Sequence, residues 1–557
     1  MRIKWKAVAL GAVGLLSACD GGSTNVNLAD SQMTSGLVSM ATANAGTSPA
    51  QSQMTDAIRL ARQASFGPTP ALLEQIAKVG IEGWIDQQLE ARGSTYADLA
   101  VPRRRDLCKD ADCSRRYFSR VPVAMRFYTD AVAAPDQLRQ RVAFALSQMI
   151  VASEVEVFAT SGIAGFNQLF LDNAFGNYRT LLKAVTLNPY MGQYLDMAGS
   201  NRSAPSENYA REMLQLFSMG PNQLNADGTP RRDATGGTIP NYGPDDIRGV
   251  SRALTGWDMA RTGSGQGFND DVRPMVPVPA RYDSGEKRFL GVTVPAGASP
   301  QASVDAVVDA AFSHPSTPPF VSRHLIVHLV TANPSPAYVG RVARVFVNNG
   351  AGVRGDLKAV VRAILTDPEA RTAPRNDRGK LKEPVLAMLS LARAIGMTTD
   401  GFAFMNRDTA LGQPVMRAPS VFNFYPIDYP LPGSQTLRSP ASKLFNSSTV
   451  LRFHNLVYDW TVRDNAAASE FRPQKWMGSA GTKLVWTTWE TFGDNIDAMI
   501  AAVDVLVLGN TITPVQRAAL RNAALAVNDK NTRLRARKRA QLLFYIAATS
   551  PQFLVDR

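Results

Sequence analysis

The sequence predicts an all-α protein: one large multi-helical domain that also carries a small β-hairpin and long Gly/Pro-rich loops. Three observations indicate this fold class. The chain has 557 residues with 45% hydrophobic content, which is enough for a large buried core. Apolar residues recur at helical spacing in many segments. Residues 206–220 combine a helix start signal, that spacing and a Gly-Pro stop.

The chain begins with a predicted secretory signal. Arg2, Lys4 and Lys6 precede an uncharged run at residues 7–16. A helix of that length spans about 15 Å, half of a hydrocarbon core of about 30 Å, so it is too short to cross a membrane. Residues 16–19 resemble the lipobox of bacterial lipoproteins. The resemblance implies that residues 1–18 are a signal peptide and that Cys19 is acylated after cleavage.

Residues 19–53 are predicted to form a flexible tether. They are rich in Gly, Ser, Thr, Asn and Ala and show no apolar periodicity. No later segment has 18 consecutive apolar residues, so we expect the lipid on Cys19 to be the membrane attachment. This organisation places a helical domain, residues 54–557, in the bacterial cell envelope, exported to the periplasm or the surface.

Cys108 and Cys113 remain as an even pair in an exported protein, and we expect them to form a disulfide. The loop that they close is small, so it contributes about 2 kcal/mol of unfolded-state entropy. A zinc site would need two further ligands, and the neighbouring carboxylates Asp110 and Asp112 are poor partners for thiolates. Arginines at 103–105 and 115–116 flank the pair and make this segment a basic excursion.

Helices are expected through most of the domain. We predict two or three within residues 54–89 and at least four within 302–367. Further helices are predicted at or within residues 138–151, 164–172, 178–188, 191–197, 379–397, 439–460, 488–508, 514–527 and 534–548. Turn signals at 225–229 and 235–238 predict the hairpin, and residues 261–300 and 412–440 predict the long loops, the first with a short strand or two.

The helix at residues 206–220 has the strongest signals. Ser206 is its predicted N-cap, and Gly220 with the following Pro is its predicted stop. Its apolar residues form two adjacent rows and leave one polar stripe, so most of its surface should be buried. Glu207 and Arg211 are spaced i, i+4 with the acid first, the order that favours an ion pair. The stripe is either a buried ion-pair network or the wall of a site.

Two groups of residues are candidates for chemistry. The first is the carboxylate and arginine set of residues 206–257: Glu207, Arg211, Glu212, Asp245, Asp246, Arg248 and Arg252. A hydrolase could use two such acids as general acid and base on a sugar or ester, which makes Glu207, Glu212, Arg211, Asp246 and Arg252 candidate catalytic residues. A structural network that holds the helices in register is the favoured interpretation.

The second group is His314, His324 and His328. His324 and His328 are spaced i, i+4, which can chelate a metal, but their neighbours are apolar and favour packed core histidines. The chain has no Gly-x-Ser-x-Gly, Ser-x-x-Lys, Walker or Cys-x-x-Cys motif, and we expect no cofactor.

The formal net charge of +13 suits anionic partners. No nucleic-acid-binding motif is present, so specific nucleic-acid binding is not expected. Our main hypothesis is an envelope lipoprotein that binds a partner protein or an anionic polymer. The alternative is a hydrolase that acts through the paired carboxylates.

Five sequence blocks lie in order along the chain: Ser206-Glu207-Asn208-Tyr209-Ala210-Arg211-Glu212, Ala253-Leu254-Thr255-Gly256-Trp257, Gly379-Lys380-Leu381-Lys382-Glu383-Pro384-Val385, Ala418-Pro419-Ser420-Val421-Phe422-Asn423-Phe424 and Ser550-Pro551-Gln552-Phe553. Together they resemble the domain-of-unknown-function 1800 family of bacteria. The resemblance runs from about Met54 to the C-terminus and implies a mostly helical secreted domain. Where family members often have aromatic and His residues, this chain has Ser147-Gln148-Met149, which argues against a His-based site there.

Overall fold

The computed structural model describes residues 49–263, 267–372, 379–463, 468–474 and 478–557. Cys19 and the predicted signal peptide lie outside this part of the chain. Within it, helices dominate and the strands form short antiparallel pairs, so the predicted fold class is confirmed.

The N-terminal part contains α2 (Pro49–Ala64), α3 (Pro70–Glu90), η1 (Arg105–Leu107), α4 (Ala111–Tyr117), α5 (Val121–Ala133), α6 (Gln137–Met149), α7 (Thr160–Asn173), α8 (Tyr178–Thr186) and α9 (Pro189–Tyr194). Next come α10 (Asn208–Gln215), α11 (Pro244–Ala253), β1 (Trp257–Asp258), β2 (Arg261–Thr262), β3 (Phe268–Asn269), β4 (Val276–Pro277), η2 (Pro279–Arg281), β5 (Lys287–Phe289) and β6 (Val292–Val294).

The middle contains α12 (Pro300–Ser313), α13 (Thr317–Leu329), α14 (Pro336–Val347), α15 (Leu357–Thr366), α16 (Pro368–Arg371), β7 (Lys380–Leu381), α17 (Pro384–Ile395) and α18 (Phe402–Ala410). The C-terminal part contains η3 (Pro440–Leu444), α19 (Ser447–Trp460), α20 (Thr487–Glu490), α21 (Ile496–Val503), the π-turn η4 (Asp504–Leu508), α22 (Pro514–Leu525), α23 (Thr532–Ala548), α24 (Pro551–Leu554) and β8 (Val555–Asp556).

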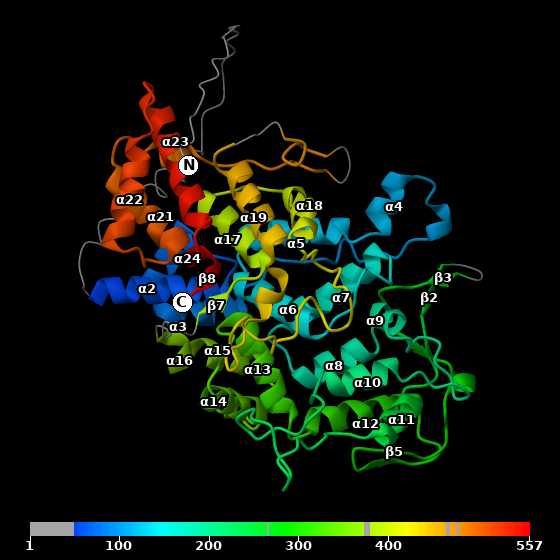
Figure 1. The fold of residues 1–557 in the computed structure, drawn as a ribbon. Helices are drawn as coiled ribbons and strands as arrows, with labels where there is room; N and C mark the ends of the chain where they lie inside the picture. The colour runs from blue at the N-terminus through cyan, green and yellow to red at the C-terminus, as the bar shows by residue number, and fades with distance from the viewer. Residues whose placement is uncertain (1–48, 264–266, 373–378, 464–467, 475–477) are drawn as a thin grey trace.

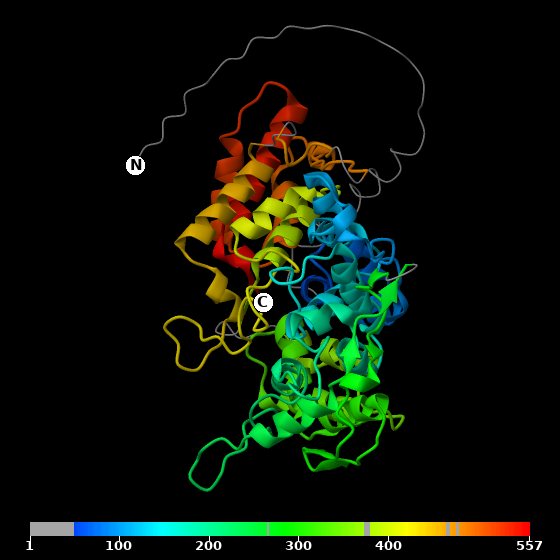
Figure 2. The ribbon, with the colours of Figure 1, turned by 90° about the vertical axis from the view of Figure 1, so that its right-hand side faces the viewer.

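The body is elongated. The C-terminal helices α21, α22 and α23 lie at one end, and α10, α11, α12 and β5 lie at the other (Figure 1). The same separation is visible after a quarter turn, with the red and orange segments at the top and the green ones at the bottom (Figure 2).

Helix α17 lies in the interior of the body. Its sequence is apolar around nearly the whole circumference, and all of its residues are buried, as expected for a helix that is surrounded by protein. It packs against α5, α18 and η4. Its one arginine, Arg393, donates from Nε to the Gly67 carbonyl (2.8 Å) and from Nη1 to the Val132 carbonyl (2.6 Å), so the buried guanidinium has backbone partners. Gly396 then ends the helix in the left-handed conformation at φ 87°.

The beginning and the end of the described chain meet beside α17. Strand β7 pairs with β8 in antiparallel register, with Lys380 opposite Asp556. Arg62 of α2 donates to the Val507 carbonyl in η4 at 2.9 Å, and Lys382 forms an ion pair with Asp556 at 2.6 Å. Helix α2 begins at Pro49, inside the range predicted as the tether. A proline suits the first helical position because its missing N–H needs no partner there.

Helix α11 packs closely on β5 through Gly249. A Cβ atom at this position would lie 2.0 Å from the Arg288 carbonyl oxygen, which leaves room only for glycine. The Asp246 side chain accepts from the Gly243 N–H (2.8 Å) at the start of α11 and from the Leu290 N–H (2.7 Å) just after β5. The first contact caps the helix, and the second connects the helix to the end of the strand.

The predicted hairpin is present between α10 and α11. Isolated bridges pair Asn222 with Pro240, Leu224 with Pro230 and Arg232 with Thr238. The long loop that follows contains more strand than predicted, because β1 pairs with β4, β2 with β3 and β5 with β6. No described helix combines the length and the apolar character that a bilayer span requires.

Candidate functional site

Helix α10 is shorter than the sequence predicts, and its N-cap is Glu207 rather than Ser206. The Ser206 hydroxyl accepts only a long bond from the Asn208 N–H, at 3.4 Å. At the other end the helix stops at Gln215, and Gly220 has φ 75°, as its predicted left-handed role requires.

The Glu207–Arg211 ion pair forms, with 3.2 Å between Arg211 Nη2 and Glu207 Oε2. The two side chains are 42% and 48% exposed, so the prediction of a buried network at this pair is wrong. Solvent screens an exposed i, i+4 pair, which contributes about 0.3–0.5 kcal/mol.

Glu212 is the buried carboxyl of α10. Its residue is 8% exposed, and its Oε2 atom has no hydrogen-bond partner. Burial raises the pKa of Glu212, and the charge of Arg211 offsets part of that rise. A carboxyl in this environment is shifted toward its protonated form.

The remaining candidate residues on α11 have partners of their own. Arg252 pairs with Asp283 at 2.7 Å, and Asp246 is used by the backbone contacts described above. Asp245 and Arg248 pair with each other on the exposed face. Helices α10 and α11 are in contact, but their charged residues do not form one network.

His324 and His328 lie on α13 and are buried. Burial lowers the pKa of His324 to about 3, and burial with the nearby His324, Lys380 and Arg141 lowers the pKa of His328 well below its ordinary value. Both rings are therefore neutral at physiological pH. His324 Nδ1 and His328 Nε2 have no hydrogen-bond partner. In the part of the chain that the structure describes, no three His, Cys, Asp or Glu residues are grouped to hold a metal.

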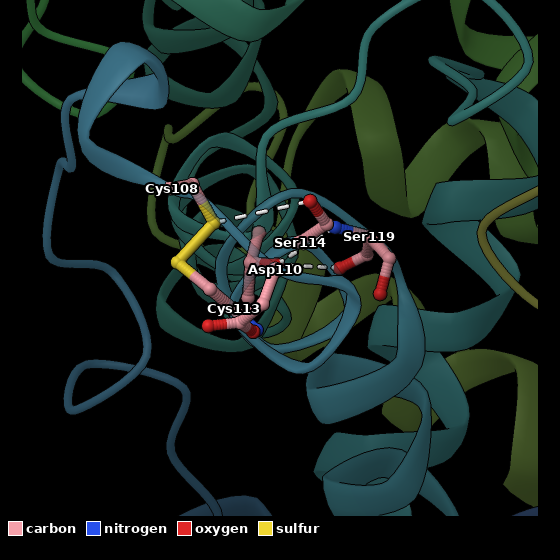
Figure 3. Close-up of a disulfide and its surroundings, with 6 residues drawn as sticks. Cys108, Asp110, Cys113, Ser114 and Ser119 are labelled. Carbon is pink, nitrogen blue, oxygen red and sulfur yellow. Dashed lines mark hydrogen bonds between the residues drawn. A yellow bond between two sulfur atoms is a disulfide. The ribbon is translucent and has the colours of Figure 1, made fainter.

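Cys108 and Cys113 are joined by a disulfide, with their Cα atoms 5.5 Å apart (Figure 3). Asp110 lies inside the loop, and its Oδ1 accepts from the Cys113 N–H at 2.7 Å, so it caps the short helix α4. Helix α4 projects at the edge of the body (Figure 1). We use the name basic excursion for residues 103–118.

The basic excursion carries six basic side chains, at 103, 104, 105, 109, 115 and 116, against three acidic ones, at 106, 110 and 112. The guanidinium carbons of Arg103 and Arg116 lie 5.1 Å and 5.9 Å from the centre of the Tyr117 ring, and that of Arg105 lies 5.5 Å from the Phe118 ring. A groove of about 830 Å³ runs along it, lined also by the loop that carries Phe158. Arg103 and Arg105 line the groove and are stabilised there by cation–π contacts, whereas Arg116 is outside its lining.

A second polar group escaped the sequence analysis. Glu383 is 3% exposed, and its carboxylate accepts from Gln148 Nε2 (3.2 Å), Gln413 Nε2 (2.5 Å) and Tyr425 Oη (2.5 Å). Asn423 Nδ2 donates to Gln148 Oε1 at 3.2 Å. Two of the family blocks, at 379–385 and 418–424, thus meet α6 at this point. Those blocks were the sequence signal that could have revealed this group, but the sequence analysis drew no site from them.

Beside this group lies a cavity of about 50 Å³ between α6, α7 and the segment 413–424. A smaller cavity of about 20 Å³ lies on its other side, lined by His328, Lys380 and Tyr425. Burial lowers the pKa of Lys380 to about 7, and its ammonium donates to the His328 carbonyl. The smaller cavity has room for one water molecule.

A family model described as "Protein of unknown function (DUF1800)" matches residues 59–555. No curated protein and no solved structure matches the chain.

Proposed function

The chain belongs to the DUF1800 family of proteins of unknown function, and from that premise we propose that it is a lipid-anchored binding protein of the bacterial cell envelope. In this proposal, Cys19 carries the lipid, residues 19–48 are the tether that precedes α2, and the helical domain holds an acidic partner on its basic excursion. Cys19 and the tether lie outside the described residues, so the proposal for the anchor depends on the sequence alone.

The arginines around Tyr117 are the observation that carries the binding proposal. Arg103 and Arg116 both contact the Tyr117 ring, so two cations are held near one another on an exposed projection. A long side chain that becomes ordered on binding loses conformational entropy, which lowers the affinity. A guanidinium already held against a ring has lost part of this entropy before the partner binds. Arginine and aromatic residues are enriched in protein interfaces, where they supply most of the energetically important contacts.

Exposed apolar residues favour a protein over a charged polymer as the partner. Leu107 of the excursion is 65% exposed, Val101 just before it is 45% exposed, and Phe158, which lines the groove, is 43% exposed. A polyanion recognised by charge alone gains nothing from such residues, whereas a protein surface with acidic and apolar side chains contacts both kinds. The disulfide closes residues 108–113, directly after Leu107, so it constrains the backbone next to this exposed side chain.

Photocrosslinking in the native envelope tests the binding proposal. A photoreactive residue replaces Leu107 in the full-length lipoprotein, and the crosslinked species are identified by mass spectrometry. We expect one predominant protein partner, lost when Arg103 and Arg116 are both changed to Glu. The matched control is Arg248→Glu, a charge reversal at an exposed arginine on α11, which should leave crosslinking unchanged.

Three results would count against it. Crosslinks to an anionic glycan or lipid in place of a protein would assign the polymer instead. Equal crosslinking in the charge-reversed protein would show that the arginines do not bind the partner. Absence of any specific crosslink would remove the basis for the excursion as a binding surface.

The anchor has a separate test. Cys19→Ala should leave an unprocessed or soluble precursor, because acyl chains contribute about 0.8 kcal/mol for each methylene that they bury in the bilayer. Fractionation of cells in high salt measures this. Unchanged retention of the variant in the membrane fraction would contradict the lipoprotein proposal.

Glu212 supports the hydrolase alternative to a limited extent. Its raised pKa and unpartnered Oε2 suit a general acid, and Glu207, paired with Arg211 one turn earlier, would be the ionised partner. Neither the groove nor the two cavities described above includes Glu212 in its lining. A Glu212→Gln protein that folds as stably as the parent but loses a measurable hydrolytic activity would establish the alternative. A loss of stability with no activity to lose would exclude it.

A further inference from the structure

The cavity between α6, α7 and segment 413–424, which we call the amide cavity, has the composition of a binding site. One part of its wall is aromatic, with Phe127, Phe144, Phe166 and Phe170 from three helices. The other part is made of side-chain amides from the same helices and the segment, namely Gln140, Gln148, Asn167, Gln413 and Asn423. No charged side chain is in the lining. A ligand that fits these walls is uncharged and has both an apolar part and hydrogen-bonding atoms.

The amides are held in fixed orientations. Glu383 accepts from Gln148 Nε2 and Gln413 Nε2, so the oxygen of each amide must face the other way. Gln148 Oε1 accepts from Asn423, and Gln413 Oε1 accepts from the Val385 N–H at 3.0 Å. A buried carboxylate therefore sets the direction of two of the five amides that line the cavity, Gln148 and Gln413, and such support is what a preorganised site requires.

Gln140 differs from the other amides. Its residue is 1% exposed, and its Nε2 atom has no hydrogen-bond partner in the structure. A buried N–H group without an acceptor is costly, and native proteins seldom leave one unpaired. An acceptor oxygen brought by a ligand into the cavity would supply the missing partner.

Backbone strain is concentrated in the segment that closes the cavity. Met416 has φ 62° and Asn423 has φ 61°, and both residues line the cavity. Asparagine tolerates the left-handed region, but methionine does so at a cost, and residues held in this way gather at ligand sites. The neighbouring structure fixes Met416, because its carbonyl accepts from the Glu154 N–H at 3.0 Å.

The size of the cavity limits the ligand. It measures about 50 Å³, which is several times the about 10–15 Å³ that one water molecule requires and well below the about 150 Å³ of an apolar cavity that binds benzene. Phe144, Ser147, Asn167 and Met416 are only half-buried, so the cavity reaches the surface between them. The buried part admits a small group, and the rest of a larger ligand would remain outside.

We propose that the amide cavity binds the acetamido group of an N-acylated ligand, with the methyl against the phenylalanine rings and the carbonyl oxygen accepting from Gln140 Nε2. An acetamido group has an apolar end, one acceptor and one donor, and no charge, which matches each part of the wall. This site is separate from the basic excursion, and the inference does not depend on the proposed function.

Saturation-transfer NMR on the full-length protein in detergent tests the proposal, with N-acetylglucosamine and glucosamine as the probes. We expect saturation of the N-acetyl methyl protons and a Kd in the roughly millimolar range, because only a few atoms of the probe are buried. Glucosamine lacks the acyl group and should give no saturable signal. Gln140→Leu should weaken binding of N-acetylglucosamine by about tenfold, the effect of one lost hydrogen bond.

A second variant keeps the test independent of Gln140. Ala143 lies on α6 in the cavity wall, and Ala143→Val should fill the space and abolish the signal. Ala359→Val, at a half-buried alanine on α15, is the matched control and should bind as the parent does. Circular dichroism and thermal melting show whether each variant folds. Absence of binding to the parent, equal binding of glucosamine, or unchanged binding in folded Ala143→Val protein would each overturn the proposal.

Discussion

The buried ion pair between Arg120 and Asp408 should dominate the response of this protein to charge removal. Arg120 Nη1 and Nη2 lie 2.8 Å and 3.1 Å from the two Asp408 carboxylate oxygens, and the side chains are 6% and 0% exposed. Tyr128 Oη donates to the same carboxylate at 3.0 Å. Asp408→Asn leaves the Arg120 charge buried without its main partner, a change that typically costs about 3–5 kcal/mol.

The expected melting shift follows from the size of the domain. An unfolding entropy of about 2.1 cal/mol/K per residue over roughly 500 residues amounts to about 1 kcal/mol/K, so Tm should fall by about 3–5 °C. Glu207→Gln removes half of the exposed pair on α10 and should lower Tm by less than about 1 °C. Differential scanning calorimetry on the full-length protein measures both.

A double variant separates the pair from its surroundings. Arg120→Met with Asp408→Leu should cost less than the sum of the single changes, because neither charge is left unpaired. If Asp408→Asn lowers Tm by no more than Glu207→Gln does, burial does not decide the strength of these ion pairs, and the reasoning is refuted.

Three further outcomes are expected. Gly249→Ala should destabilise the protein by about 3 kcal/mol in urea titration, because its Cβ would overlap a strand carbonyl. Gly243→Ala is the control and should cost less than about 1 kcal/mol, because the nearest atom to its Cβ would be 3.9 Å away. Equal costs for the two variants would contradict the close approach of α11 to β5. Burial raises the pKa of Asp130 to about 7, so the folded state binds more protons than the unfolded one between pH about 4 and about 7. This group should therefore lower the free energy of unfolding across that range by up to about 1.4 kcal/mol per pH unit. Thermal melts at several pH values should show that Asp130→Asn removes this part of the dependence of stability on pH. An unchanged dependence would show that the pKa of Asp130 is not raised. Elemental analysis of the purified protein should find no stoichiometric zinc or iron, because burial and the charge of Arg323 both disfavour a cation near His324. One equivalent of metal that is lost in the His324→Ala protein would reverse this expectation.

Local patterns predicted the helices well because the signals are local. A helix was predicted within residues 379–397, and α17 spans Pro384–Ile395. Turn residues predicted the hairpin at 222–242, since a few backbone angles near Gly and Asn decide such turns. The Cys108–Cys113 bond was predictable because the two residues are close in sequence.

Polar partners between distant segments were not predictable in this way. Glu207 and Arg211 are neighbours on one helix and were predicted to be a buried pair, but which face of α10 is exposed depends on what packs against it. Arg120 and Asp408 lie 288 residues apart, and no periodicity relates them.

By itself, therefore, the sequence determined the helical class, the hairpin, the disulfide and membership of the family, since each depends on neighbouring residues or on ordered blocks. Only the tertiary structure decided which polar groups are buried together. Glu383, Gln148, Gln413 and Asn423 come from three separate segments, and their carboxylate and amides become a site only when folding removes water from around all of them at once.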